Sequence, residues 1–123
     1  MEFFICKHCG NVVAYVERVG PNIVCCGEAM TTFVPNTMDA AIEKHVPIIQ
    51  KDDNKVTVTV GSARHPMVEE HHIAWISLQT MQGNQRKELQ HTGDPQAVFM
   101  LADGDEPISA YARCNIHGLW KNA

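Results

Sequence analysis

Lys55-Val-Thr-Val-Thr-Val60 alternates strictly between valine and polar residues and stops at Gly61. Because successive side chains of a strand point to opposite faces, this pattern predicts a strand that buries its valines on one face. Further short stretches of strand-like composition follow, separated by turn signals at intervals of roughly 8–12 residues. They are Val46–Lys51, His72–Thr80, Arg86–Gln90, Gln96–Ala102 and Ile108–Cys114. The series predicts a mainly β protein with an all-β sandwich over residues 37–123.

The first 36 residues have a different character. Their apolar side chains are scattered, and a segment of this size does not normally bury enough surface to fold without a staple. Four of the five cysteines of the chain lie here, and Pro35-Asn36 is a turn signal that marks a boundary. We therefore expect a small stapled domain over residues 1–36. The one helix candidate, Thr37 to Ile42, follows directly, with Thr37 as its N-cap.

Composition excludes several classes of function. The 123 residues carry a net charge of −4, with 20% charged and 45% hydrophobic residues, as in ordinary globular domains. Lysines and arginines form no cluster, so we expect no nucleic-acid binding. No run of 18 apolar residues occurs, so we expect no membrane span. The N-terminus lacks the build of a signal peptide, which predicts a cytoplasmic protein, where clustered cysteines more often bind metal than form disulfides.

Cys6-Lys-His-Cys9-Gly10 has the spacing of a metal-binding knuckle, with two sulfurs able to reach one ion and a glycine that permits the tight turn. The second pair, Cys25-Cys26, is adjacent, so we expect a distorted tetrahedron. Four thiolates select zinc or iron. The spacing leaves a structural zinc and a one-iron redox centre equally open.

A second set of donors lies in the β region: His45, His65, His71, Cys114 and His117. Four imidazoles and one thiolate give five donors, and an octahedral ion would keep one position open for a small molecule. Zinc rarely takes five protein ligands, whereas iron does so readily. A ferrous ion with one thiolate keeps a net positive charge and attracts small anions. Beside this set, Lys44 can draw an anion in, and Glu43 can cover the open position once the metal is oxidised.

Taken together, these residues resemble the desulfoferrodoxins, the two-iron superoxide reductases. The matching segments span nearly the whole chain: Cys6-Lys-His-Cys9-Gly, Cys25-Cys26-Gly, Glu43-Lys-His-Val-Pro47, His65-Pro-Met67 with His71, and Cys114-Asn-Ile-His117-Gly. The resemblance implies a desulforedoxin-like (rubredoxin-like) four-cysteine iron domain over residues 1–36. It implies an immunoglobulin-like catalytic domain over residues 37–123.

The resemblance also implies roles for individual residues. One iron would be held by Cys6, Cys9, Cys25 and Cys26, and the second by His45, His65, His71 and His117 in its plane, with Cys114 as the axial ligand. His117 would bind through Nδ1 and the other three histidines through Nε2. Lys44 would attract superoxide, and Glu43 would close the oxidised site. His72 and His91 are not expected to be ligands, because the gap of six residues from His65 selects His71.

The function that this resemblance implies is the one-electron reduction of superoxide to hydrogen peroxide, in a homodimer that takes electrons from rubredoxin or a similar small carrier. Two other functions fit the same residues. The first is an electron-transfer protein that uses the four-cysteine iron, and the second is a zinc-bound interaction module. Elemental analysis and the reaction of the reduced protein with superoxide discriminate among the three.

Overall fold

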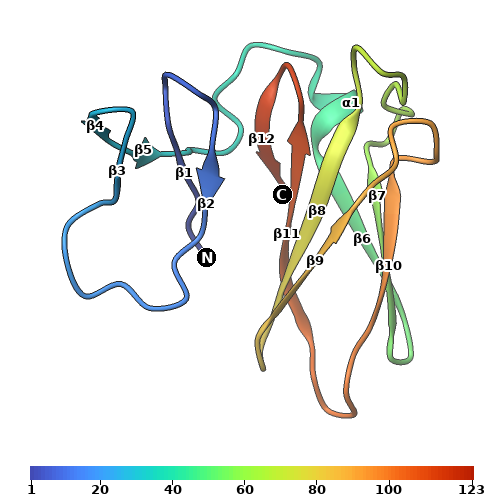
Figure 1. Ribbon diagram of the computed structural model, residues 1–123. Helices are drawn as coiled ribbons and strands as arrows, with labels where there is room; N and C mark the ends of the chain where they lie inside the picture. Colours follow the sequence, from blue (N-terminus) through green and yellow to red (C-terminus); the bar gives the residue numbers. More distant parts are fainter. The chain divides into compact units, whose positions relative to one another are not determined.

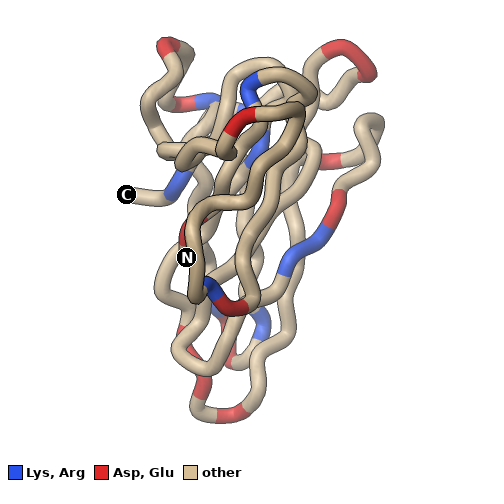
Figure 2. The backbone as a smooth tube through the Cα atoms, turned by 60° about the vertical axis from the view of Figure 1, so that its left-hand side comes forward, with Lys and Arg blue, Asp and Glu red and all other residues tan.

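The computed structural model describes residues 1–123, and the chain divides into two compact units, Met1–Val34 and Pro35–Ala123 (Figure 1). Acidic and basic residues are interspersed along the backbone, with no long basic stretch (Figure 2). No helix in the chain has the length and apolar character that crossing a membrane requires.

The first unit is built from five strands of two residues each. Three of them form a sheet in the order β2-β1-β5: β1 Phe4–Ile5, β2 Val12–Val13 and β5 Thr31–Thr32. The other two, β3 Val24–Cys25 and β4 Glu28–Ala29, pair as a hairpin. Its buried cluster consists only of Phe4, Cys6 and Met30. A core this small leaves the unit dependent on another source of stability.

The second unit is a sandwich of two antiparallel sheets. The three-stranded sheet has the order β10-β7-β6, from β6 Pro47–Asp52, β7 Lys55–Val60 and β10 Gln96–Met100. The four-stranded sheet has the order β12-β11-β8-β9, from β8 Ile73–Thr80, β9 Asn84–Glu88, β11 Pro107–Cys114 and β12 Gly118–Lys121. Side chains from both sheets form one core, with Val58 and Phe99 from one and Ile76 and Trp120 from the other.

The predicted mainly β class is confirmed, and β7 has the predicted bounds. Its three valines, Val56, Val58 and Val60, are fully buried, as the alternation requires. In the sandwich, β12 is not predicted, because the chain after Cys114 carries a turn motif and the four following residues are too few to show a period. It forms because Cys114 pairs with Gly118 across a tight turn and the ladder continues to Tyr111 and Lys121. The two-residue strands β1–β5 of the first unit are not predicted either.

The predicted helix over Thr37–Ile42 is wrong. The only helix, α1, covers Ile42–His45, and its N-cap residue Ala41 makes no side-chain capping bond. Burial of His45, a local contact to Ala41 and a tertiary hydrogen bond from Ala63 set its position instead of side-chain capping. The ring of His45 is buried, its Nδ1 lies 2.7 Å from the Ala41 carbonyl, and the Glu43 carbonyl accepts a hydrogen bond from Ala63.

Candidate metal centres

Two hairpin-like turns bring the four N-terminal cysteines together. Cys6 follows β1, and Cys25 ends β3, with Cys9 and Cys26 in the adjoining turns. The four Sγ atoms all lie within 4.8 Å of one another, and the Cys9 and Cys25 sulfurs are 3.6 Å apart. A tetrahedral ion with metal–sulfur bonds of about 2.3 Å would place its sulfurs about 3.8 Å apart. The set therefore has the dimensions of a four-thiolate metal centre.

The adjacent second pair fits because the backbone turns sharply there. Cys26 has a φ of 53° and Gly27 a φ of 77°, both in the left-handed region. For a residue other than glycine this conformation costs on the order of 1 kcal/mol or more. The turn brings both neighbouring sulfurs into the same set as Cys6 and Cys9, and Gly10, with a φ of 83°, closes the first turn.

The thiols of this set are too close to ionise independently. The backbone N–H of Cys9 lowers the pKa of Cys6 to about 6, whereas sharing a hydrogen bond with the Cys9 thiol raises the pKa of Cys26 to about 12. None of the five cysteines forms a disulfide bond. Four thiolates within a few ångströms of one another require a cation to balance them, and a soft divalent or trivalent ion does so.

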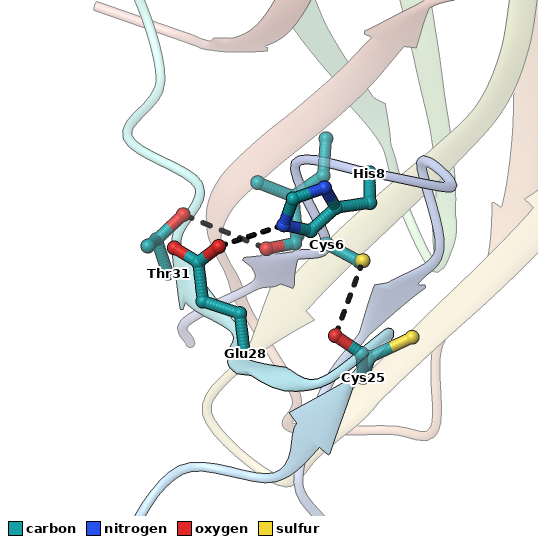
Figure 3. Close-up of polar contacts among 6 residues, drawn as sticks. Cys6, His8, Cys25, Glu28 and Thr31 are labelled. Carbon is teal, nitrogen blue, oxygen red and sulfur yellow. Dashed lines mark hydrogen bonds and ion pairs between the residues drawn. The ribbon is translucent and has the colours of Figure 1, made fainter.

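An ion pair joins the two turns that carry the cysteines. His8, between Cys6 and Cys9, lies with its Nε2 2.7 Å from Glu28 Oε2, just beyond the second pair (Figure 3). The hydrogen bond to Glu28 raises the pKa of His8. Both side chains are more than half exposed, so their contribution to stability is modest. The contact nonetheless ties the loops that hold the sulfurs.

The second donor set comes from three separate segments of the sandwich. His45 ends α1, and His65 and His71 lie in the β7–β8 loop. Cys114 ends β11, and His117 lies in the turn before β12. These segments gather at one end of the sandwich (Figure 1). The sequence-predicted donors, which are up to 72 residues apart, are thereby brought together.

The four imidazole rings form a square. Neighbouring rings have centroids 4.6–5.0 Å apart and stand nearly perpendicular, at 79–83°, in the order His45, His65, His71, His117. The rings of His45 and His71 face each other across the square, with centroids 6.2 Å apart. Four rings that surround one point in this order suit the equatorial ligands of an octahedral or square-pyramidal ion.

The ring nitrogens point into the square. His45 Nε2 lies 3.2 Å from His65 Nε2 and 3.2 Å from His117 Nδ1. Adjacent ligands with metal–nitrogen bonds of about 2.1 Å are about 3 Å apart, so these spacings suit a shared ion. The outward nitrogens are held by the backbone, since Nδ1 of His45 and of His65 each lie 2.7 Å from a carbonyl oxygen. Such bonds fix the tautomer with Nε2 free to bind.

A buried nitrogen without a partner supports a metal in this set. The Nε2 atom of His71 is buried and makes no hydrogen bond. Leaving such a group unsatisfied costs about 1–3 kcal/mol, which an ion at the centre of the square would remove. Burial also lowers the pKa of His45 and His71, and that of His65 to about 4. These three histidines are therefore neutral near pH 7, as metal ligands must be.

Cys114 supplies the one anionic donor. Its side chain is fully buried, and its Sγ lies within 4.8 Å of the ring nitrogens of His45, His65 and His71. Burial raises the pKa of the Cys114 thiol, whereas the backbone N–H groups of Ile116 and His117 lower it. A cation in the square would favour the thiolate that these N–H groups already face. The residues thus fit an iron ion with four imidazoles and one thiolate.

Glu43 and Lys44 lie on α1 beside the set, and both are exposed. The charge of Lys44 lowers the pKa of His45 and His71, after the larger effect of burial, so its field reaches the square. The ion pairs of the chain are His8–Glu28, Lys51–Glu106 and Arg64–Asp94, and neither residue takes part in them. Both side chains are free to act on a small ion.

Several residues that shape this set carry no recognisable sequence signal. The indole of Trp120 packs on the His45 ring with centroids 4.8 Å apart, and its Nε1 donates to the His117 carbonyl. Gly61 packs closely against the Glu43 carbonyl, and the side chain of Asn115 is hydrogen-bonded to the main chain of the β7–β8 loop. His72 and His91 form a pair of their own, with ring centroids 5.8 Å apart, and do not belong to the donor set.

Comparison with known proteins identifies the class. The family model for desulfoferrodoxin matches residues 37–123, and the model for the desulfoferrodoxin N-terminal domain matches residues 1–33. A desulfoferrodoxin homolog of Archaeoglobus fulgidus is 42% identical over 122 residues, which are 99% of this chain and 96% of that protein. Two solved structures are also similar. The superoxide reductase from Treponema pallidum has a TM-score of 0.83 and 37% identity, covering 99% of this chain and 98% of that one. The one-iron superoxide reductase from Giardia intestinalis has a TM-score of 0.56 and 34% identity, covering 65% and 95%.

The fold and the two donor sets define a non-haem iron protein with a four-thiolate centre and a centre of four imidazoles and one thiolate. With family models matching nearly every residue, the chain belongs to the desulfoferrodoxin family.

Proposed function

We propose that this chain reduces superoxide to hydrogen peroxide at the set formed by His45, His65, His71, His117 and Cys114. In the balanced reaction, superoxide takes up one electron and two protons and becomes hydrogen peroxide. The observation that carries the proposal is the convergence of four imidazole rings around one point with one buried thiol beside them. Five donors leave one coordination position for a small anion.

Iron held in this set would supply the transferred electron and an open position for superoxide. The four imidazoles bring no charge, and the Cys114 thiolate brings one, so the site keeps the positive charge that attracts an anion. The Cys114 thiolate would supply electron density to iron held in the set, as in thiolate-ligated haem enzymes. Because Cys114 is fully buried, solvent does not compete for its sulfur.

The relatives support placing catalysis in the second unit. The Treponema pallidum and Giardia intestinalis structures are both named superoxide reductases, and the latter is named as a one-iron form. Its similarity covers 65% of this chain, far more than the first 34 residues provide. A chain of that class that matches mainly the sandwich fits a reaction located at the histidines and Cys114.

Lys44 is proposed to attract superoxide, and Lys44→Ala is expected to slow the bimolecular reaction roughly tenfold at low ionic strength. The rate should also depend less on salt, because the screened attraction has been removed. Stopped-flow mixing of reduced protein with superoxide at several salt concentrations measures both effects. Lys55→Ala is the matched control. It removes the same charge from the first residue of β7, whereas the turn that contacts α1 follows the last residue of that strand. Equal rates for the wild type and Lys44→Ala would remove Lys44 from the mechanism.

Gly61 holds the backbone of the proposed catalytic pair. A Cβ at this position would lie 2.5 Å from the Glu43 carbonyl oxygen and 2.9 Å from the Lys44 carbonyl carbon. The Glu43 carbonyl also accepts hydrogen bonds from the Ala63 N–H at 2.8 Å and the Ser62 hydroxyl at 3.3 Å. The turn after β7 therefore fixes the position of α1 over the histidines.

Gly61→Ala is accordingly expected to displace Glu43 and Lys44 and to lower the rate with superoxide roughly tenfold. The measurement is the same stopped-flow reaction, together with the iron content, which should stay unchanged. Gly83→Ala is the control, because a Cβ there meets nothing within 4 Å. A Gly61→Ala protein with the wild-type rate would show that the close approach does not set the position of the pair.

Glu43 is proposed to cover the open position after oxidation. Its carboxylate is exposed on α1 and free of ion pairs. Burial lowers the pKa of His45, and the negative charge of Glu43 raises it in part. A carboxylate is a suitable ligand for a ferric ion, which is a harder acceptor than a ferrous one. Its closure would protect the oxidised centre until an electron arrives.

The four-thiolate centre supports a second, electron-transfer role. Cys9 and Cys26 are exposed, so an iron held there lies within reach of a partner. We propose that a rubredoxin-like carrier donates electrons, that the protein works as a homodimer, and that it resides in the reducing cytoplasm, in keeping with its free cysteines. Sedimentation at several concentrations tests the dimer, and reduction kinetics with purified rubredoxin test the donor.

A superoxide pulse delivered to the fully reduced protein tests the proposed function. The expected yield is one hydrogen peroxide per superoxide consumed, with loss of one electron from the protein and no oxygen release. A half equivalent of peroxide with oxygen evolution would instead indicate a dismutase. Absence of any reaction, in protein that contains two irons, would leave electron transfer as the function.

A further inference from the structure

Asn115 joins the two loops that carry the ligands of the second centre. It lies between Cys114 and His117, and its side chain reaches a segment 43–45 residues earlier in the chain. Its Oδ1 accepts a hydrogen bond from the His72 N–H at 2.8 Å, and its Nδ2 donates to the Glu70 carbonyl at 3.0 Å. The Asn115 N–H donates to the His72 carbonyl at 3.1 Å.

These three hydrogen bonds hold the main chain on both sides of His71, at Glu70 and at His72. The ring of His71 has no hydrogen bond of its own at Nε2 and contacts the other three rings of the square, and its main chain pairs with Val68. The positions of its neighbours therefore set where its imidazole lies. On the other side, the regular pairing of β11 with β8 ends, after an irregularity, at Cys114 and Ile73. Asn115 continues the link beyond the end of the sheet.

The carboxamide of Asn115 satisfies both side-chain partners at once. The group at residue 115 must accept from one N–H and donate to one C=O, and a primary amide offers an acceptor and a donor in one plane. Aspartate keeps the acceptor but has no donor for the Glu70 carbonyl. Alanine keeps neither, while the main-chain bond to His72 remains.

We propose that Asn115 is a positioning residue that holds His71 in register with Cys114 and His117, so that the donor set is assembled before the metal binds. This inference rests on the proposed function, since it concerns the metal of that set. Residues that orient metal ligands typically change metal affinity 10- to 100-fold when they are replaced. The loss of both side-chain bonds is expected to fall in that range.

Iron release to a chelator tests this role without reference to catalysis. Wild-type, Asn115→Ala and Asn115→Asp proteins are loaded with iron, and the loss of each centre is followed by its visible absorption. We expect Asn115→Ala to release iron from the histidine and Cys114 set at least tenfold faster than the wild type, with Asn115→Asp intermediate. The four-cysteine centre in the same chain should release iron at an unchanged rate. The thiolate-to-iron absorption of the oxidised second centre should also shift.

Asn122→Ala is the matched control. Asn122 brackets β11 in the same way, with its Oδ1 accepting from the Ala110 N–H at 2.8 Å and its own N–H donating to the Ala110 carbonyl. It lies beyond the opposite end of the β11–β12 ladder from Cys114 and should retain iron like the wild type. Wild-type retention by both Asn115 variants, or equal loss from Asn122→Ala, would overturn the inference. If Asn115→Ala does not fold, Asn115→Asp decides alone. Wild-type protein that binds no metal at this set would overturn the proposed function instead.

Discussion

In a Cys114→Ser variant, the rate of the reaction with superoxide is expected to fall at least about 100-fold. Even residues that only orient metal ligands change activity roughly 10- to 100-fold when they are replaced. Cys114 is the sole anionic donor of its set, and it is fully buried. Serine is a poor substitute, since its hydroxyl does not ionise near pH 7 and lacks the soft electron density of sulfur. The electron density that the Cys114 thiolate would supply to the metal is thereby removed.

The measurement for Cys114→Ser is the superoxide pulse, accompanied by iron analysis and visible spectra. The absorption of the four-cysteine centre should be unchanged, because none of its ligands has been altered, and it reports that the first unit has folded. A Cys114→Ser protein that reduces superoxide at the wild-type rate would show that the sulfur is dispensable. The reaction would then have to be assigned to another site.

The second large effect is expected in the first unit. A Cys9→Ser variant, or removal of the metal from the four-cysteine set, should unfold residues 1–34 and leave the sandwich intact. The unit buries only a small cluster and has strands of two residues, so the metal supplies most of its stability. Structural zinc in small domains contributes an apparent free energy of about 10–16 kcal/mol, which indicates the scale of such a loss.

Amide hydrogen exchange measures this unfolding residue by residue. The Phe33 and Met30 amides, which donate to Phe3 and Ile23 within the first unit, should lose their protection. Amides in the β8–β11 ladder of the sandwich serve as an internal control and should stay protected. Retained protection of Phe33 and Met30 in metal-free protein would show that the small core suffices.

Most strands of the sandwich can be predicted from the periodicity of the sequence, but α1 and β12 cannot. In β7 the alternation of valine with polar residues has one interpretation, because one face must be buried. In α1 the helical turn has no cap and is held by the buried His45 ring and the turn at Gly61. Contacts between residues distant in sequence determine where such short elements form. The local sequence pattern carries no information about these contacts.

The donor set shows the same division. The residue types and spacings around His65, His71 and Cys114 indicate metal binding, because imidazole and thiolate are scarce and chemically specific. Asn115 and Trp120 give no such signal, since an asparagine or a tryptophan serves many purposes. Their roles arise from hydrogen bonds and ring packing to segments about 40 to 75 residues away, which exist only after the chain has folded.

X-ray absorption at the iron edge of the Cys9→Ser protein tests the central claim most directly, because that variant keeps only the second centre. The account predicts one iron per chain with one sulfur and four or five nitrogen or oxygen neighbours. Iron surrounded by sulfur alone, or a variant that retains no iron while the sandwich remains folded, would contradict it.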